Sequence, residues 1–172
     1  MKQILFLFTV SLLGSLTSKA QSGANIYFEL GGPGLASFNF DTRFAKKEDG
    51  LGGRIGIGGF SLRTTFNNGT GTSTERASVI FVPVGVNYLL GKDGKNYFEL
   101  GAGVTPVFTS SKNDLGSDNF SSTFGNILFG YRMQPQNGGF TFRAFINPIF
   151  GSFGFVPYYG GVSFGYKFGG HK

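Results

Sequence analysis

The strongest constraint on this chain is an alternation of apolar and polar residues that recurs from about residue 25 almost to the C-terminus. A period of two is typical of β-strands, whose successive side chains point to opposite faces of a sheet. The 30 glycines and 22 phenylalanines agree with this interpretation, because glycine is a poor helix former and phenylalanine fits a pleated surface. The alternation predicts one all-β domain of about eight strands, at residues 25–31, 35–44, 51–62, 78–90, 97–109, 122–133, 140–150 and 158–168.

The two faces of these strands differ in charge. In 25–31, for example, Ile26 and Leu30 alternate with Tyr27 and Glu29. The apolar faces hold no charged residue, whereas the opposite faces hold Glu29, Asp41, Arg43, Arg54, Glu99, Arg132, Arg143 and Lys167. An uncharged face suits lipid, and strands of about 10–12 residues suit a membrane better than the ~5–6 of soluble proteins. The pattern predicts an antiparallel up-and-down transmembrane β-barrel.

One strand is out of phase and several aromatic residues gather near strand ends. Phe60 and Leu62 do not continue the alternation of Ile55 and Ile57, and a bulge at Gly58-Gly59 would restore it. Aromatic belts mark the lipid–water interface of membrane barrels. The expected belt consists of Phe44, Tyr88, Tyr97, Tyr131, Tyr158 and Tyr159.

The predicted connections alternate in length. Residues 45–50, 91–96 and 135–139 are short polar turns, whereas 64–77 and 110–121 are longer. Outer-membrane barrels have short periplasmic turns and longer outer loops. We therefore expect 64–77 and 110–121 to be loops on the outer side.

The first twenty residues differ from the rest of the chain. Lys2 supplies a positive charge, residues 4–16 are mostly apolar, and Ser-Lys-Ala follows at 18–20. This pattern predicts a cleaved signal peptide at 1–20 and a barrel at 21–172. A membrane anchor is the alternative, but the apolar run is shorter than the ~20 residues needed to span a bilayer.

Composition excludes several kinds of chemistry. The formal charge is +6, but the basic residues are scattered and form no stripe, so no nucleic-acid partner is expected. The single histidine, His171, lies beside the C-terminus, and there is no cysteine. A Ser-His-Asp site would need the tail to fold back, and multi-histidine or thiolate metal sites are excluded. We expect no catalytic residue, no metal site and no cofactor.

The lumen of an eight-stranded barrel is just wide enough for side chains to fill it. We therefore expect a monomer whose eight inward charges lie in the periplasmic half. Charges in a confined interior persist when they are paired, so they should form a layer of ion pairs that closes the barrel. Glu99–Arg132, on neighbouring strands, is the best candidate pair. Five basic against three acidic residues leave a surplus that favours water or an anionic ligand.

Several segments carry a resemblance to a known group of proteins. These are residues 26–32, 37–44, 82–91, 140–143 and 160–168, which together span nearly the whole chain after the signal peptide. They resemble uncharacterised small outer-membrane β-barrel proteins of the Bacteroidetes type. The resemblance implies a barrel in the outer membrane of a Gram-negative bacterium, in contact with outer-membrane lipid. It implies no activity.

The last strand adds a partner to what the resemblance implies. A final strand that ends in an aromatic residue is similar to the signal read by the barrel-assembly machinery. Here Phe168 is followed by four more residues, 169–172, so the match is imperfect. The extracellular partner is not identified by the sequence.

These expectations leave several functions open. The first is a non-enzymatic structural or surface-interaction protein with a side-chain-filled lumen. The alternative is a narrow channel or a carrier of a lipid or small ligand, and a lipid-modifying enzyme is a third. A soluble lipocalin-like barrel would need its apolar faces inside. The string Tyr-Phe-Glu-Leu-Gly occurs at both 27–31 and 97–101, which leaves a duplicated half or convergent strand chemistry open.

Overall fold

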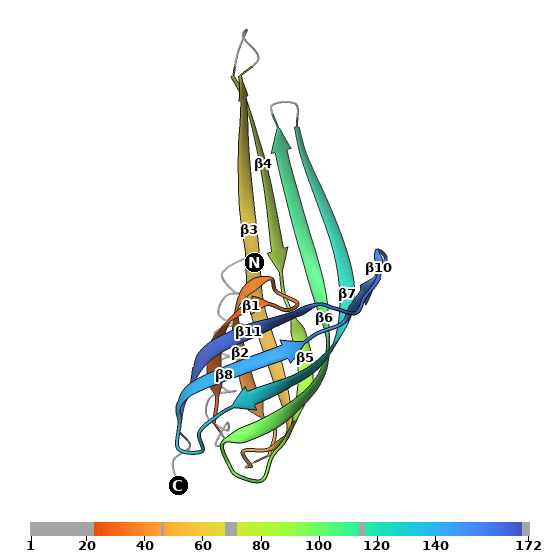
Figure 1. The fold of residues 1–172 in the computed structure, drawn as a ribbon. Coiled ribbons are helices and arrows are strands. Elements are labelled where there is room, and N and C mark those ends of the chain that lie inside the picture. The colour runs from red at the N-terminus through yellow and green to blue at the C-terminus, as the bar shows by residue number, and fades with distance from the viewer. Residues whose placement is uncertain (1–22, 46, 68–71, 114–115, 170–172) are drawn as a thin grey trace, which may run out of the picture.

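The computed structural model describes residues 23–45, 47–67, 72–113 and 116–169, and these consist of strands and their connections (Figure 1). Within these ranges no helix is long and apolar enough to cross a membrane. The predicted signal peptide and His171 lie outside the described residues.

The strands form a closed antiparallel barrel. They are β1 (Asn25–Gly31), β2 (Ala36–Arg43), β3 (Gly50–Asn67), β4 (Thr72–Phe81), β5 (Val84–Leu90), β6 (Asn96–Asn113), β7 (Gly116–Met133), β8 (Gly139–Ile146), β9 (Ile149–Gly151), β10 (Gly154–Val156) and β11 (Gly160–Lys167). β4 and β5 are two parts of one barrel strand, interrupted beside Pro83, and β8 and β9 are interrupted beside Pro148. Proline has no amide hydrogen for the ladder, which explains both breaks. β11 pairs with β1 and closes the ring, so the predicted eight-stranded barrel is confirmed.

The wall of the barrel is tall on one side and short on the other. β1, β2, β8 and β11 have seven or eight residues, whereas β3, β6 and β7 have 18 each. At ~3.4 Å per residue these lengths are about 25 Å and about 60 Å. The β3–β4 and β6–β7 hairpins accordingly rise well above the rest of the barrel (Figure 1). The strands thus depart from the expected length of about 10–12 residues in both directions.

The two segments expected to be long outer loops are mostly strand. β3 continues to Asn67 and β4 begins at Thr72, while β6 continues to Asn113 and β7 begins at Gly116. The reason is physical: residues 61–65 are all exposed, whichever side of the strand they lie on. Both faces therefore tolerate Ser, Thr and Arg, and the hydrophobic alternation disappears while the backbone pairing continues.

The bulge expected at Gly58-Gly59 is absent. β3 pairs in one unbroken register, from Gly50↔Leu89 through Gly58↔Phe81 to Asn67↔Thr72. Phe60 and Leu62 consequently lie on the lumen side of β3, but above the short wall, where they are exposed. No lumen surrounds them at that height, so apolar side chains are tolerated at positions that would face a polar lumen lower in the barrel.

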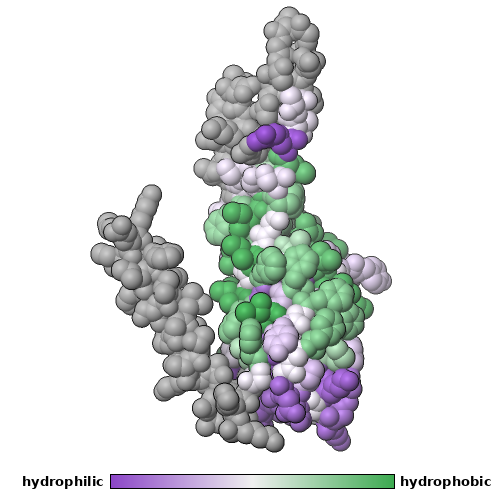
Figure 2. All heavy atoms as spheres, turned by 90° about the vertical axis from the view of Figure 1, so that its left-hand side faces the viewer, coloured by the Kyte–Doolittle hydropathy of each residue, from purple (hydrophilic) through white to green (hydrophobic). Residues whose placement is uncertain are grey.

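The barrel is apolar outside and polar inside. Glu29, Asp41 and Arg132 are fully buried, whereas Phe38, Ile57 and Ile146 are each about 60% exposed. On the face shown in Figure 2, hydrophobic residues form a band across the barrel, and hydrophilic residues gather at its lower end. A lipocalin-like soluble barrel has the opposite arrangement, so that alternative is wrong.

The aromatic belt needs one correction. Phe44, Tyr88, Tyr131 and Tyr158 are exposed as a belt requires, but Tyr97 is only 3% exposed. Tyr97 and Glu99 are both buried on the inner side of β6, two residues apart, so Tyr97 fills the lumen near the short turns.

Candidate functional site in the barrel lumen

Seven of the eight predicted lumen charges lie together in one buried layer. They come from six different strands, and each occupies an inward position of its strand. They are Glu29 on β1, Asp41 and Arg43 on β2, Arg54 on β3, Glu99 on β6, Arg132 on β7 and Arg143 on β8. None of the seven is more than 7% exposed, so the layer is shielded from bulk water.

The seven charges form one continuous chain in which the sign alternates. Its order is Arg43–Asp41–Arg132–Glu99–Arg143–Glu29–Arg54. The successive nitrogen–oxygen distances are 2.7, 2.9, 3.7, 2.7, 3.5 and 3.0 Å. Each acid contacts two arginines, and an arginine stands at both ends. Four arginines against three carboxylates leave one positive charge without a partner.

Glu99 is held mainly by Arg143. Nε and Nη2 of Arg143 donate to the two carboxylate oxygens of Glu99 at 2.8 and 2.7 Å, which is a bidentate pair. The expected pair Glu99–Arg132 is present at 3.7 Å, but Arg132 donates its shorter hydrogen bond to Asp41, at 2.9 Å. In the register, Glu99 faces Gly130 of β7, so Arg143 reaches Glu99 from β8 past a position without a side chain.

Two further residues belong to the layer, and the sequence reasoning missed both. The Asn87 amide donates to Asp41 at 2.5 Å and to Glu99 at 2.7 Å, and its oxygen accepts from Arg43 at 2.5 Å. The Tyr27 ring lies 4.6 Å from the Arg143 guanidinium carbon, within the range of a cation–π contact. Both occupy positions that the alternation assigns to the lumen, and this assignment was the sequence signal that could have identified them.

Glycines on β3 give the layer its space. A Cβ at Gly52 would collide with the Arg43 guanidinium, and one at Gly56 would collide with the Asn39 amide. The glycine content that indicated strands in the sequence therefore also makes room for large polar side chains in a narrow lumen.

Lys167 lies apart from the chain of charges. Its ammonium group contacts Glu48, in the 45–50 turn, and donates to the backbone oxygens of Pro135 at 3.0 Å and Gln136 at 2.9 Å. It therefore ties the last strand to two of the short turns. At the same end Arg43 donates to the Gly50 oxygen at 3.0 Å, so the charged layer lies toward the short turns.

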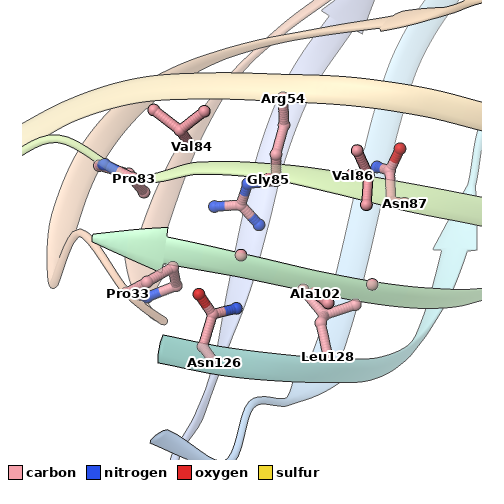
Figure 3. Close-up of a pocket in the computed structure, with 12 residues that line it drawn as sticks. Pro33, Arg54, Pro83, Val84, Gly85, Val86, Asn87, Ala102, Asn126 and Leu128 are labelled. Atoms are coloured by element: carbon pink, nitrogen blue, oxygen red, sulfur yellow. The ribbon is translucent and has the colours of Figure 1, made fainter. Parts of the chain in front are cut away.

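A small cavity lies beside the Arg54 end of the layer. Figure 3 shows the Arg54 guanidinium pointing into it, with Asn126 and Leu128 of β7 on the other side and Pro33 and Pro83 at its edge. Across the part of the chain that is described, no cluster of His, Cys, Asp and Glu side chains could hold a metal ion.

No family model matches the chain, and no curated protein matches it. Among solved structures it is similar to Ail, the attachment invasion locus protein of Yersinia pestis, with 15% identity over 85% of this chain and 94% of that chain. The TM-score is 0.42 for that crystal structure and 0.45 for Ail in complex with the heparin analogue sucrose octasulfate, at the same identity and coverage. A likeness at this identity concerns the backbone fold and carries none of the lumen residues across.

Proposed function

We propose that this protein is a non-enzymatic outer-membrane β-barrel of a Gram-negative bacterium, with a closed lumen and a surface-interaction role for its projecting hairpins. The observation that carries the proposal is the tall wall. β2 stops pairing with β3 at Gly58, and β9 stops pairing with β7 at Gly125. Above these points β3, β4, β6 and β7 continue as a four-stranded sheet.

The size of this sheet supports an external role. Nine residues of β3, from Gly59 to Asn67, extend beyond the last pairing with β2. At ~3.4 Å per residue they reach about 30 Å along the strand. Exposed polar residues such as Thr64 and Thr65 occupy this part. A barrel whose role was confined to the bilayer would not need such a wall, whereas a protein that contacts something outside the cell would.

The apolar band supports insertion in a membrane. Soluble proteins rarely expose contiguous apolar patches of more than a few hundred Å², and such patches usually mark a binding surface or a lipid surface. Here large apolar side chains are exposed on every barrel wall, from Ile26 on β1 to Phe164 on β11. Outer-membrane lipid is the proposed partner of this band, and insertion would use the barrel-assembly machinery. We expect a monomer, because lipid alone can cover the band.

The buried chain of charges supports a closed lumen. Each acid is held by two arginines, and moving any member of the chain aside would remove one or two of these ion pairs in a confined space. The layer should therefore act as a plug. The narrow-channel alternative predicts the opposite electrical behaviour, so the two can be separated directly.

The test has three parts, one for each element of the proposal. The membrane fraction should keep the protein after carbonate extraction, and the folded barrel should show heat-modifiable migration on detergent gels. Planar bilayers with the wild type should show no steady conductance, and ohmic channels would favour the channel instead.

Protease added to intact cells should cut within the β3–β4 or β6–β7 hairpins. A variant with both hairpins shortened should still insert but lose adhesion to extracellular surfaces, and unchanged adhesion would contradict the surface role.

A further inference from the structure

The chain of lumen charges has an odd number of members, so one positive charge in it has no counter-charge. Seven alternating charges with arginine at both ends carry a net charge of +1. A buried charge without a counter-charge is costly. The five interior members of the chain each contact two opposite charges. The uncompensated positive charge therefore lies at one of the two ends, Arg43 or Arg54.

At the Arg43 end both terminal nitrogens of the guanidinium group have acceptors, and Nε alone is buried without a hydrogen-bond partner. Its Nη1 donates to the Gly50 oxygen at 3.0 Å, and its Nη2 donates to the Asn87 side-chain oxygen at 2.5 Å as well as to Asp41. With the backbone oxygen of Asn87 at 3.5 Å, four acceptor atoms surround this guanidinium group. Gly50 lies in the first position of β3, so this end also faces the short turns.

The Arg54 end is not satisfied. Its Nη2 donates to Glu29 at 3.0 Å and Asn39 at 3.3 Å, but its Nη1 is buried and has no hydrogen-bond partner. The side chain of Arg54 is only 6% exposed, so bulk water does not solvate that nitrogen. Arg43 and Arg132 also have buried nitrogens without a hydrogen-bond partner, but of these three arginines Arg54 is the one that lines the cavity described above, so a missing acceptor is expected there.

The strand register builds a gap opposite this nitrogen. Arg54 pairs with Gly85, Gly85 with Gly103 and Gly103 with Asn126, so four adjacent strands contribute one row to the lumen wall. The two middle members have no side chain, which leaves a cavity between Arg54 and Asn126 (Figure 3). None of the residues that line this cavity is acidic.

We propose that this cavity binds one small inorganic anion of about the size of a halide ion, held by Nη1 of Arg54. A water molecule would satisfy the donor but leave the charge of the chain uncompensated, whereas an anion does both. The free space is about 10 Å³, enough for the centre of a single small species, so a monatomic anion is preferred to phosphate or sulfate. Bound there, the anion extends the alternation to eight charges and makes the plug neutral. The inference needs the lumen geometry only, and it holds whatever the hairpins bind.

Bromide is a suitable probe because it is close to chloride in size and scatters anomalously. The protein, folded in detergent, is unfolded by urea at constant ionic strength while sodium bromide replaces sodium gluconate, whose anion is too large for the cavity. The chain has no tryptophan, so folding is followed by circular dichroism and by the gel shift. The unfolding equilibrium constant should fall in proportion to 1/(1 + c/Kd), where c is the bromide concentration, which is about tenfold at ten times the apparent Kd.

Two variants and one crystal experiment decide the outcome. Arg54→Gln should abolish the bromide dependence, whereas Arg63→Gln, which removes an exposed arginine of the same strand, should keep it. Crystals of the wild type in bromide should show an anomalous peak beside Nη1 of Arg54, and this result stands even if Arg54→Gln does not fold. Equal stabilisation by gluconate, an unchanged effect in Arg54→Gln, or no peak at this position would each overturn the proposal.

Discussion

Breaking the chain of charges at its middle should cost more stability than any other single lumen change. Glu99 is the central acid of the chain, and Glu99→Gln removes the charge while keeping nearly the same volume. The carboxylate accepts two short hydrogen bonds from Arg143 and one from Asn87, and it also faces Arg132 at 3.7 Å. Its loss raises the net charge of the buried layer from +1 to +2. Removing one partner of a buried ion pair typically costs ~3–5 kcal/mol, and we expect a value in this range.

A double-mutant cycle shows where that energy comes from. Arg143→Gln removes the closest partner of Glu99, and combined with Glu99→Gln it should restore part of the loss, because neither charge is then left unpaired. The coupling energy should be ~1.5–3 kcal/mol for Glu99 with Arg143 and smaller for Glu99 with Arg132, in line with 2.7 Å against 3.7 Å.

The free energy of unfolding is measured by urea titration of the barrel in detergent micelles or lipid vesicles. Arg63→Gln, on the exposed part of β3, is the control and should change it by less than ~0.5 kcal/mol. Purely additive effects of Glu99→Gln and Arg143→Gln, or a larger coupling with Arg132 than with Arg143, would refute this order of contacts in the chain of charges.

Three other changes test the remaining parts of the structure. Ile146→Arg, on the outward face of β8, should destabilise the barrel in vesicles by ~2–4 kcal/mol but much less in detergent, and equal costs in both would count against a lipid-facing position. Asn87→Ala should cost ~1–3 kcal/mol, because it leaves three charged partners each one hydrogen bond short, and a neutral effect in the same titration would contradict that bridging role. The Asn96 side chain and backbone hydrogen-bond Asp93 and lower its pKa from 3.8 to about 2, so this turn contributes stability above pH ~4 that is lost as the pH falls toward 2. Asp93→Asn should therefore reduce the stability difference between pH 5 and pH 2 relative to the wild type, and an unchanged difference would show that the turn does not titrate.

The sequence predicted the barrel because lipid and lumen impose opposite requirements on alternate residues. β1 was predicted at its observed bounds, and Ile26 and Glu29 lie on the outward and inward faces that the alternation indicated. Where the strand leaves the barrel, as at Thr64 and Thr65, water lies on both sides and the requirement ends. The hairpins could therefore not be recognised from hydrophobicity. The threonine-rich composition of this segment was the remaining signal, because β-branched residues favour strands.

The partners within the layer could not be predicted for a different reason. Alternation shows which residues face the lumen, but it does not show how far each strand is shifted against its neighbours. Arg132 and Arg143 are register partners on β7 and β8, so two like charges face each other directly. This pair is tolerated because acids from β2 and β6 lie on either side of it. A prediction from neighbouring strands alone finds Glu99–Arg132 and misses the closer pair, which spans an intervening strand.

The choice of arginine over lysine follows from the same geometry. A cation in the interior of the chain of charges must contact two carboxylates in different directions. A planar guanidinium group with five donors can do this while staying charged. Arg132 contacts Asp41 and Glu99 with different nitrogens, and Arg143 does the same with Glu99 and Glu29. The inward lysine Lys167 lies outside the chain of charges, where its compact ammonium group contacts one carboxylate and two backbone oxygens. Arginine thus occurs where a lumen cation must bridge two carboxylates, and lysine occurs where the cation holds two of the short turns to the last strand.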